Sequence, residues 1–290
     1  MSSEIVFTHH DLDGVTCAIL LKKVFPNIEI VKNTYATINN NFLKHIHYSK
    51  KKYDKIFIAD ISLNEDIHIQ ELIHKNNKII TFIDHHPLRY NFHITDTYHN
   101  LNKSGSLLTL EYLIKKYNFE FSKEIKKLVV YANDYDLWKH KYVLSKVINR
   151  LFYFYAFDKF FKRFQNGFNG LSSEELDYIK KNHAYIQKKL IETEYSKVSD
   201  NVIFVTASEF IDELAEHYYQ NIKGVDTVFV LNTKNNNLSI RGTHPAIHYG
   251  QFAELFGGGG HEKASGIKTT GYAQIEKIIN DFLELHEKSN

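Results

Sequence analysis

The chain contains one cysteine, three prolines and no apolar run approaching the ~18 residues that a membrane-spanning helix requires. The single Cys17 excludes an intramolecular disulfide and fits a reducing compartment, so we expect a cytoplasmic protein with no membrane partner. The scarcity of proline excludes a long Pro-rich linker. The first residues also lack the basic and apolar segments of a secretory signal.

A large excess of one charge is missing too, because 36 Lys and Arg face 34 Asp and Glu, for a net charge of +2. This balance excludes a polycation that coats nucleic acid. The charge is uneven along the chain, however: residues 139–189 hold eleven basic and four acidic residues, a local +7, and the remainder sums to −5. Histidine is abundant, with 17 residues, and it is the commonest metal ligand in proteins.

Apolar runs in the first half of the chain predict strands at residues 5–8, 28–31, 55–59 and 79–83. These runs are continuous rather than alternating, which is typical of strands whose two faces are both covered by helices. Helices are expected between and after them, at residues 14–25, 104–117 and 123–131. Strands that alternate with helices predict a parallel sheet.

The second half predicts a connecting helix and then a smaller α/β domain. Ser172 and Glu175 form a capping box that opens a long polar helix, after an aromatic segment that we expect to be mostly core. Strands are expected at residues 202–205, 227–231 and 238–241, and helices at 209–220 and 273–286. We therefore predict a domain at 1–145, a helical linker at 146–196 and a second domain at 197–290.

Four acidic segments in the first domain each come just after a predicted strand or an apolar run. The four segments are His9-His10-Asp11-Leu12-Asp13-Gly14, Asp60, Asp84-His85-His86 and Asn133-Asp134-Tyr135-Asp136-Leu137-Trp138. Each alone could be a turn or a helix cap. The carboxyl ends of parallel strands open into one crevice, however, so all four should converge there.

Convergence would crowd several carboxylates together without a basic partner, and they would repel one another unless a cation were bound. Carboxylates with one or two imidazoles suit Mn²⁺ or Mg²⁺. The ligands are numerous enough for two ions about 3.5–4 Å apart, the arrangement used in hydrolytic phosphoryl transfer. Asp60 is the natural bridging carboxylate, and the spacing leaves open whether Asp134 or Asp136 binds metal.

These four segments resemble the motifs of the DHH phosphoesterases, a family named for the sequence at Asp84-His85-His86. The segment Phe256-Gly-Gly-Gly-Gly-His261-Glu-Lys-Ala-Ser-Gly266 is similar to the glycine-histidine motif of the C-terminal domain associated with that family. The resemblance implies a two-domain α/β enzyme with its active site between the domains. It also implies hydrolysis of phosphoesters or phosphoanhydrides with two Mn²⁺ ions and a bridging hydroxide.

The resemblance assigns roles residue by residue. The metal ligands it implies are His9, Asp11, Asp13, Asp60, His85 and Asp134. His86 would contact the substrate phosphate, and Asp84 would orient a neighbouring histidine.

The C-terminal motif supplies the expected substrate contacts, which are Gly258, Gly259, Gly260 and His261. A glycine run lets backbone N–H groups approach a phosphate. Arg241 could pair with a phosphate through two hydrogen bonds, although a surface position on a strand is an equally good interpretation.

The predicted function is a metal-dependent phosphodiesterase that digests short oligoribonucleotides from an end, with short RNA or a nucleotide as partner and a possible homodimer. The resemblance favours this branch through the short first motif and the minimal two-domain length. The alternatives are a small-nucleotide phosphatase, acting on 3′-phosphoadenosine 5′-phosphate or a cyclic dinucleotide, and a RecJ-like exonuclease on single-stranded DNA. A nucleotide-binding sensor with an inactive site is disfavoured, because every motif is intact.

Overall fold

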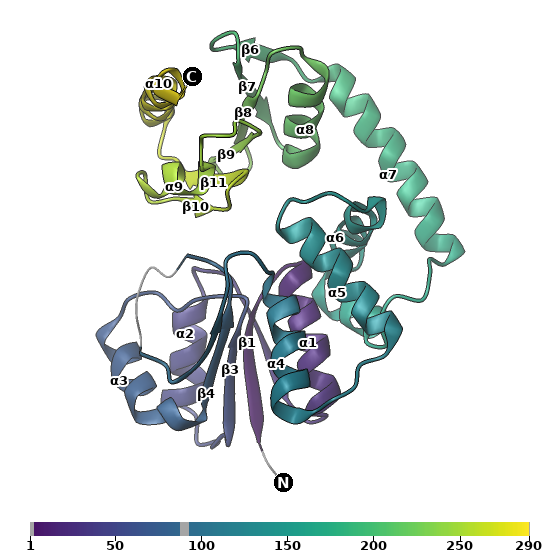
Figure 1. The fold of residues 1–290 in the computed structure, drawn as a ribbon, viewed down its shortest axis with the longest axis vertical. Helices are drawn as coiled ribbons and strands as arrows, with labels where there is room; N and C mark the ends of the chain where they lie inside the picture. The colour runs from purple at the N-terminus through teal and green to yellow at the C-terminus, as the bar shows by residue number, and fades with distance from the viewer. Residues whose placement is uncertain (1–2, 88–92, 290) are drawn as a thin grey trace. The chain divides into compact units, whose positions relative to one another are not determined.

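The computed structural model of the chain describes residues 3–87 and 93–289 (Figure 1). Contacts divide the chain into two compact units, residues 1–175 and 176–290, which are described separately here. Within the described residues, no helix is both long enough and apolar enough to cross a bilayer.

The first unit is built on a five-stranded sheet in the order β2–β1–β3–β4–β5. All neighbouring strands are parallel, which confirms the predicted sheet. The strands are β1 (Glu4–His9), β2 (Glu29–Asn33), β3 (Lys55–Ala59), β4 (Ile80–Asp84) and β5 (Asp96–His99). Only β5 was not predicted, because this edge strand, Asp-Thr-Tyr-His, has no apolar run to reveal it.

Helices cover both faces of this sheet, which explains the continuous apolar strands (Figure 1). Ile5 and Phe7 pack on the side of α2 (Ile38–Phe42) and α3 (Ile67–Asn76). The other side carries α1 (Leu12–Val24) and α4 (Gly105–Tyr117), which are neighbours, and both contact α5 (Lys123–Asp136). A short π-helix, η1 (Leu43–His47), and a 3₁₀ turn, η2 (Asn77–Ile79), complete the connections.

The aromatic segment forms α6 (Val143–Phe164), which bends at Ala156, where φ is 54° and ψ is 172°. Phe157, Phe160 and Phe164 are buried, as expected for core residues. Since α6 contacts α1 and α5, it belongs to the first unit.

The capping box opens α7 (Ser173–Glu192) as predicted, close to the boundary between the units. The Ser172 N–H donates to Glu175, and the Glu175 N–H donates to Ser172 Oγ. Nε of Arg163 also donates to Glu175 Oε1, at 2.8 Å.

The second unit contains a six-stranded sheet in the order β10–β11–β9–β8–β7–β6. Only β7 and β8 are parallel. Its strands are β6 (Tyr195–Lys197), β7 (Val202–Ala207), β8 (Thr227–Asn232), β9 (Asn237–Gly242), β10 (Gly259–Gly260) and β11 (Ala264–Lys268). The expected smaller α/β domain is therefore present.

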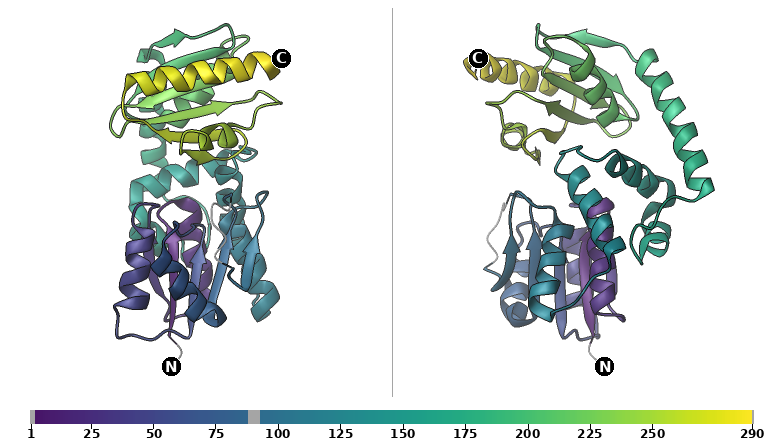
Figure 2. Two further views of the ribbon diagram at one scale, coloured as in Figure 1. Left: turned by 90° about the vertical axis from the view of Figure 1, so that its left-hand side faces the viewer. Right: turned by 45° about the vertical axis from the view of Figure 1, so that its right-hand side comes forward.

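Helices pack on both faces of this second sheet. The residues of α8 (Ile211–Asn221) share a core with Ile203 and Val228. On the other face, α9 (Tyr249–Glu254) and α10 (Tyr272–Ser289) pack on Phe229. Figure 2 shows α10 lying along the sheet.

Candidate metal centre

Three of the predicted residues lie level with one another at the carboxyl edge of the first sheet. Thr8 of β1 pairs with Ala59 of β3, and Ala59 pairs with Ile83 of β4. The next residue on each strand is therefore His9, Asp60 or Asp84. The convergence expected from the sequence follows directly from this register.

Asp11 and Asp13 reach the same edge from the start of α1. Asp11 is the N-cap, and its Oδ1 accepts the Gly14 N–H at 2.8 Å. Its Oδ2 lies 2.6 Å from Nδ1 of His9. Asp13, in the first turn, is 2 % exposed.

Asp60 has a left-handed backbone conformation, with φ of 60°. Aspartate tolerates this region better than most residues, and the Asp60 N–H donates to the Ile83 carbonyl at 2.9 Å. Its side chain is 1 % exposed, and neither oxygen accepts a hydrogen bond from a residue that the structure describes. Buried carboxylate oxygens without a donor are costly, so their presence indicates that a cation binds here.

In the third motif, Asp84 holds a neighbouring histidine, whereas His85 lies among the potential metal ligands. Asp84 accepts hydrogen bonds from Ser62 Oγ at 2.7 Å and from the His85 N–H, and its Oδ1 lies 2.8 Å from Nδ1 of His86. Nε2 of His85 lies 3.2 Å from Asp60 Oδ1 and 3.3 Å from Asp136 Oδ2. Asp84 therefore orients His86, whereas His85 faces the carboxylates.

The structure places Asp136, and not Asp134, among these carboxylates. The two Asp134 oxygens accept the backbone N–H groups of Lys141 and Tyr142, at 3.0 and 3.2 Å. Asp134 thus fixes the turn after α5, a role that keeps it out of the ligand group. This placement favours Asp136 in the choice that spacing alone left open.

Two of the groups of potential ligand atoms at this edge are His9, Asp11 and Asp60, and Asp13, His85 and Asp136; within each group all atoms lie within 4.8 Å of one another. Asp60 and His85 also belong to a further such group with Asp84 and His86. Asp60 belongs to the first group and lies 3.2 Å from His85 of the second. This arrangement fits two divalent cations with a carboxylate between them.

The electrostatics show the same crowding. Burial raises the pKa of Asp60 well above its usual value, and the charges of Asp13 and Asp11 raise it further. Burial and the same two charges also raise the pKa of Asp136. A bound cation would favour the ionised form of both groups.

Two carboxylates have local partners instead. Burial raises the pKa of Asp11, but the charge and hydrogen bond of His9 outweigh it and hold this pKa well below the usual range. For Asp84, burial has the same effect and His86 outweighs it. Both carboxylates therefore remain ionised, each beside a histidine.

Sequence reasoning did not single out Ser104-Gly105-Ser106, the beginning of α4. Ser106 donates to Asp13 through its hydroxyl, at 2.5 Å, and through its N–H, at 3.1 Å. A Cβ on Gly105 would lie 2.6 Å from the Asp60 Cβ. The only signal in the sequence was a run of small residues before an apolar helix, and such runs are common where helices begin.

In the second unit, the glycine motif forms the short edge strand β10. Gly259 and Gly260 pair with Gly266 and Ser265 of β11. A Cβ on Gly258 would lie 2.3 Å from the Gly266 carbonyl oxygen, and one on Gly260 equally close to the Ala264 carbonyl. Both glycines are thus required by the close approach of two backbones.

Arg241 is already engaged within the second unit. Its Nη2 lies 2.8 Å from Asp212 Oδ1, and its Nη1 donates to the Ser265 carbonyl at 2.7 Å. Phosphate binding by this side chain would have to compete with Asp212. His261 closes the β10–β11 turn, where its N–H donates to the Ala264 carbonyl at 2.7 Å.

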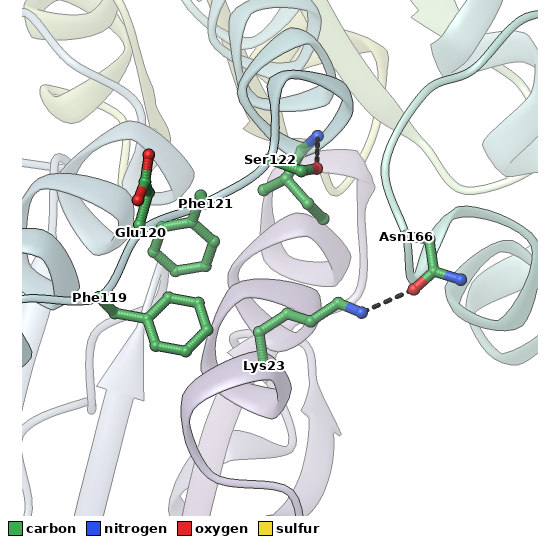
Figure 3. A pocket seen from close by; sticks show the side chains of 7 residues that line it. Lys23, Phe119, Glu120, Phe121, Ser122 and Asn166 are labelled. Atoms are coloured by element: carbon green, nitrogen blue, oxygen red, sulfur yellow. Dashed lines mark hydrogen bonds between the residues drawn. The ribbon is translucent and has the colours of Figure 1, made fainter.

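None of the aspartates of the candidate metal centre lines the pocket in Figure 3. Lys23, near the end of α1 that is remote from Asp11, lines it and donates to Asn166 Oδ1 at 2.7 Å. Phe119 and Phe121 supply its apolar wall. We assign no role in the metal centre to it.

Comparison with known proteins identifies the first unit. Residues 4–132 match the N-terminal domain of the DHH family. The first unit therefore contains a DHH-type N-terminal domain. The fold and the phosphoesterase class expected from the sequence are thereby confirmed.

Relatives of this chain include two curated enzymes. Oligoribonuclease NrnB of Bacillus subtilis is 26% identical over 297 residues, which cover 91% of this chain and 72% of NrnB. A 3′,5′-cyclic-nucleotide phosphodiesterase of Helicobacter pylori is 25% identical over 345 residues, covering 94% of this chain and 98% of the relative. Both names describe enzymes that cleave phosphodiesters of nucleotides.

A solved structure with the same fold is RecJ of Thermus thermophilus in complex with Mn²⁺. It has a TM-score of 0.57 and 12% identity, and the match covers 97% of this chain and 52% of RecJ. The likeness supports the architecture described here for this chain.

Proposed function

We propose that this DHH protein is a divalent-metal-dependent phosphodiesterase that hydrolyses short oligoribonucleotides from an end. The observation that carries the proposal is Asp60: a buried carboxylate between two ligand groups, with oxygens that accept no hydrogen bond from the described residues. The similarity to NrnB supports the choice of substrate.

Two ions, Mn²⁺ or Mg²⁺, are proposed as cofactors. His9, Asp11 and Asp60 would hold one, and Asp13, His85 and Asp136 the other, with Asp60 shared. When bound, the ions would neutralise the carboxylates, polarise the phosphate and lower the pKa of a water molecule. The Mn²⁺ complex of RecJ supports this choice of metal.

His86 is proposed to bind the phosphate that is cleaved. Its Nδ1 lies 2.8 Å from Asp84 Oδ1, so the protonated ring would donate one N–H to Asp84 and the other to a phosphate oxygen. The side chain is 20% exposed and thus accessible to a ligand. Asp84 would fix the ring and stabilise its positive charge.

The substrate contacts proposed for the second unit are the backbone of Gly258, Gly259 and Gly260 and the side chain of His261. Arg241 would contribute only if a phosphate displaced Asp212. The similarity to the cyclic-nucleotide phosphodiesterase, which extends over 98% of that relative, favours a cyclic nucleotide as the second candidate substrate.

The test is an assay of the purified protein with Mn²⁺ on a five-nucleotide RNA, the matching DNA, a cyclic nucleotide and pyrophosphate. We expect the wild-type protein to shorten the RNA stepwise and to release mononucleotides. An Asp60→Asn variant purified identically should not shorten the RNA. Turnover of the cyclic nucleotide alone would favour the second candidate, and turnover of pyrophosphate alone would contradict both.

A further inference from the structure

The first turn of α4, Ser104-Gly105-Ser106, contacts three of the four motifs. It follows β5 in the chain and begins at the carboxyl edge of the sheet, where the ligand groups lie. Ser104 and Ser106 are both fully buried.

Ser106 binds Asp13 through two donors. Its hydroxyl lies 2.5 Å from Oδ1 and its N–H lies 3.1 Å from Oδ2, so both carboxylate oxygens are held. Hydrogen bonds to an ionised carboxylate are stronger than those between neutral groups. The orientation of Asp13 within its ligand group therefore depends on Ser106.

Gly105 sets the position of Asp60. A Cβ at this residue would lie 2.6 Å from the Asp60 Cβ and 2.9 Å from its Oδ1. No side chain larger than hydrogen fits without moving Asp60. The start of α4 thus packs directly against the carboxylate that lies between the two ligand groups.

Ser104 ties the same turn to the fourth motif. Its N–H donates to Asn133 Oδ1 at 3.0 Å, and its hydroxyl caps the helix and lies 3.1 Å from Ser106 Oγ. Asn133 is three residues before Asp136 on α5. One helix start therefore links Asp13, Asp60 and the helix that carries Asp136.

We propose that Ser104-Gly105-Ser106 is a positioning element that holds the ligand carboxylates at metal-binding separations, with Ser106 as its principal residue. The proposal rests on the metal-dependent function proposed above. Partners that orient metal ligands typically contribute about 10- to 100-fold in metal affinity.

The experiment is a Mn²⁺ titration of the full chain, followed through the electron paramagnetic resonance signal of free Mn²⁺, which requires no catalysis. Ser106→Ala should weaken Mn²⁺ binding by about 10- to 100-fold, and Gly105→Ala should weaken it at least as much. Ser106→Thr keeps the hydroxyl and should bind more tightly than Ser106→Ala.

Ser122→Ala is the matched control. Ser122 caps α5 by accepting the Ile125 N–H, but it does not belong to the ligand groups of the described residues. Its variant should lose thermal stability and keep wild-type affinity for Mn²⁺. Should Ser106→Ala fail to fold, Ser106→Cys replaces it, because a thiol is a weaker donor.

The outcomes separate the two proposals. A wild-type chain that binds no Mn²⁺ would overturn the proposed function. A wild-type chain that binds Mn²⁺ while Ser106→Ala binds it within twofold would overturn the positioning role alone. Equal losses of affinity in Ser106→Ala and Ser122→Ala would also overturn it, because helix stability would then explain the effect.

Discussion

The charged side chains of the two units differ in the partners that surround them. At the edge of the first sheet, Asp60 is buried with oxygens that accept no hydrogen bond from the described residues, and the charges of Asp11 and Asp13 lie close to it beside His85. In the second unit, Arg241 is paired with Asp212, and Nε2 of His286 lies 3.1 Å from both oxygens of Asp226. The first arrangement leaves carboxylate oxygens without a donor among the described residues, whereas Arg241 and His286 in the second each lie against a carboxylate.

This difference shows which kinds of side-chain cluster allow a function to be inferred. A charge cluster that is unstable by itself indicates what must bind, in this case divalent metal. A satisfied network indicates stability instead. The substrate-binding role proposed for the second unit is therefore best tested through its backbone glycines and His261, more than through Arg241.

The largest expected effect comes from Asp60→Asn. Activity and Mn²⁺ binding should fall by more than about 100-fold, since even residues that only support metal ligands contribute about 10- to 100-fold. The metal-free variant should be more stable than the wild type at neutral pH. Folding raises the pKa of Asp60, so its ionisation opposes folding, and asparagine removes this effect.

Hydrolysis assays and thermal unfolding in a chelator would measure both effects on Asp60→Asn. An asparagine variant that is less stable than the metal-free wild type would show that Asp60 has a stabilising partner, and the contrast between the units would be lost.

The second prediction compares Asp136→Asn with Asp134→Asn. Asp136→Asn should lose most activity with little loss of stability. Asp134→Asn should lose about 1–3 kcal/mol of stability, because the amide cannot accept the N–H groups of Lys141 and Tyr142 equally well. Denaturant unfolding beside an activity assay would distinguish them, and the reverse pattern would restore Asp134 as the ligand.

The third prediction concerns metal and stability. Mn²⁺ at about 100 times its dissociation constant should stabilise the first unit by about 2.7 kcal/mol per site. Amide hydrogen exchange should show slower exchange in β1, β3 and α1, and unchanged exchange in β8 and β9. Equal protection of both sheets would mean that the second unit also responds to metal.

The smallest expected effect is that of Arg241→Gln. Loss of the partly exposed pair with Asp212 should cost about 0–1 kcal/mol of stability, and kcat should change little. A rise in KM that Asp212→Asn does not reproduce would show that Arg241 binds substrate. Unfolding and steady-state kinetics on both variants would decide this.

Much of the first sheet was predictable, because its strands are apolar runs and parallel register aligns their ends. Asp60 could be found this way, since it directly follows the run 55–59. β5 could not, because a polar edge strand lacks that signal.

The assignment of Asp136 needed the structure for a geometric reason. The helix predicted to end near Tyr131 continues to Asp136 as α5. Residues two apart on a helix point in directions about 200° apart, so only one of Asp134 and Asp136 can face the ligand group. Spacing alone does not show which face of α5 meets the sheet.

The left-handed backbone at Asp60 limits how this enzyme could change over evolutionary time. Asparagine and glycine are the other residues that adopt such a conformation readily, whereas glutamate, the other carboxylate, does so at greater cost. A lineage that lost catalysis would therefore drift most easily to Asn or Gly at this position. It would keep the fold and leave an inactive homologue that differs by a single codon.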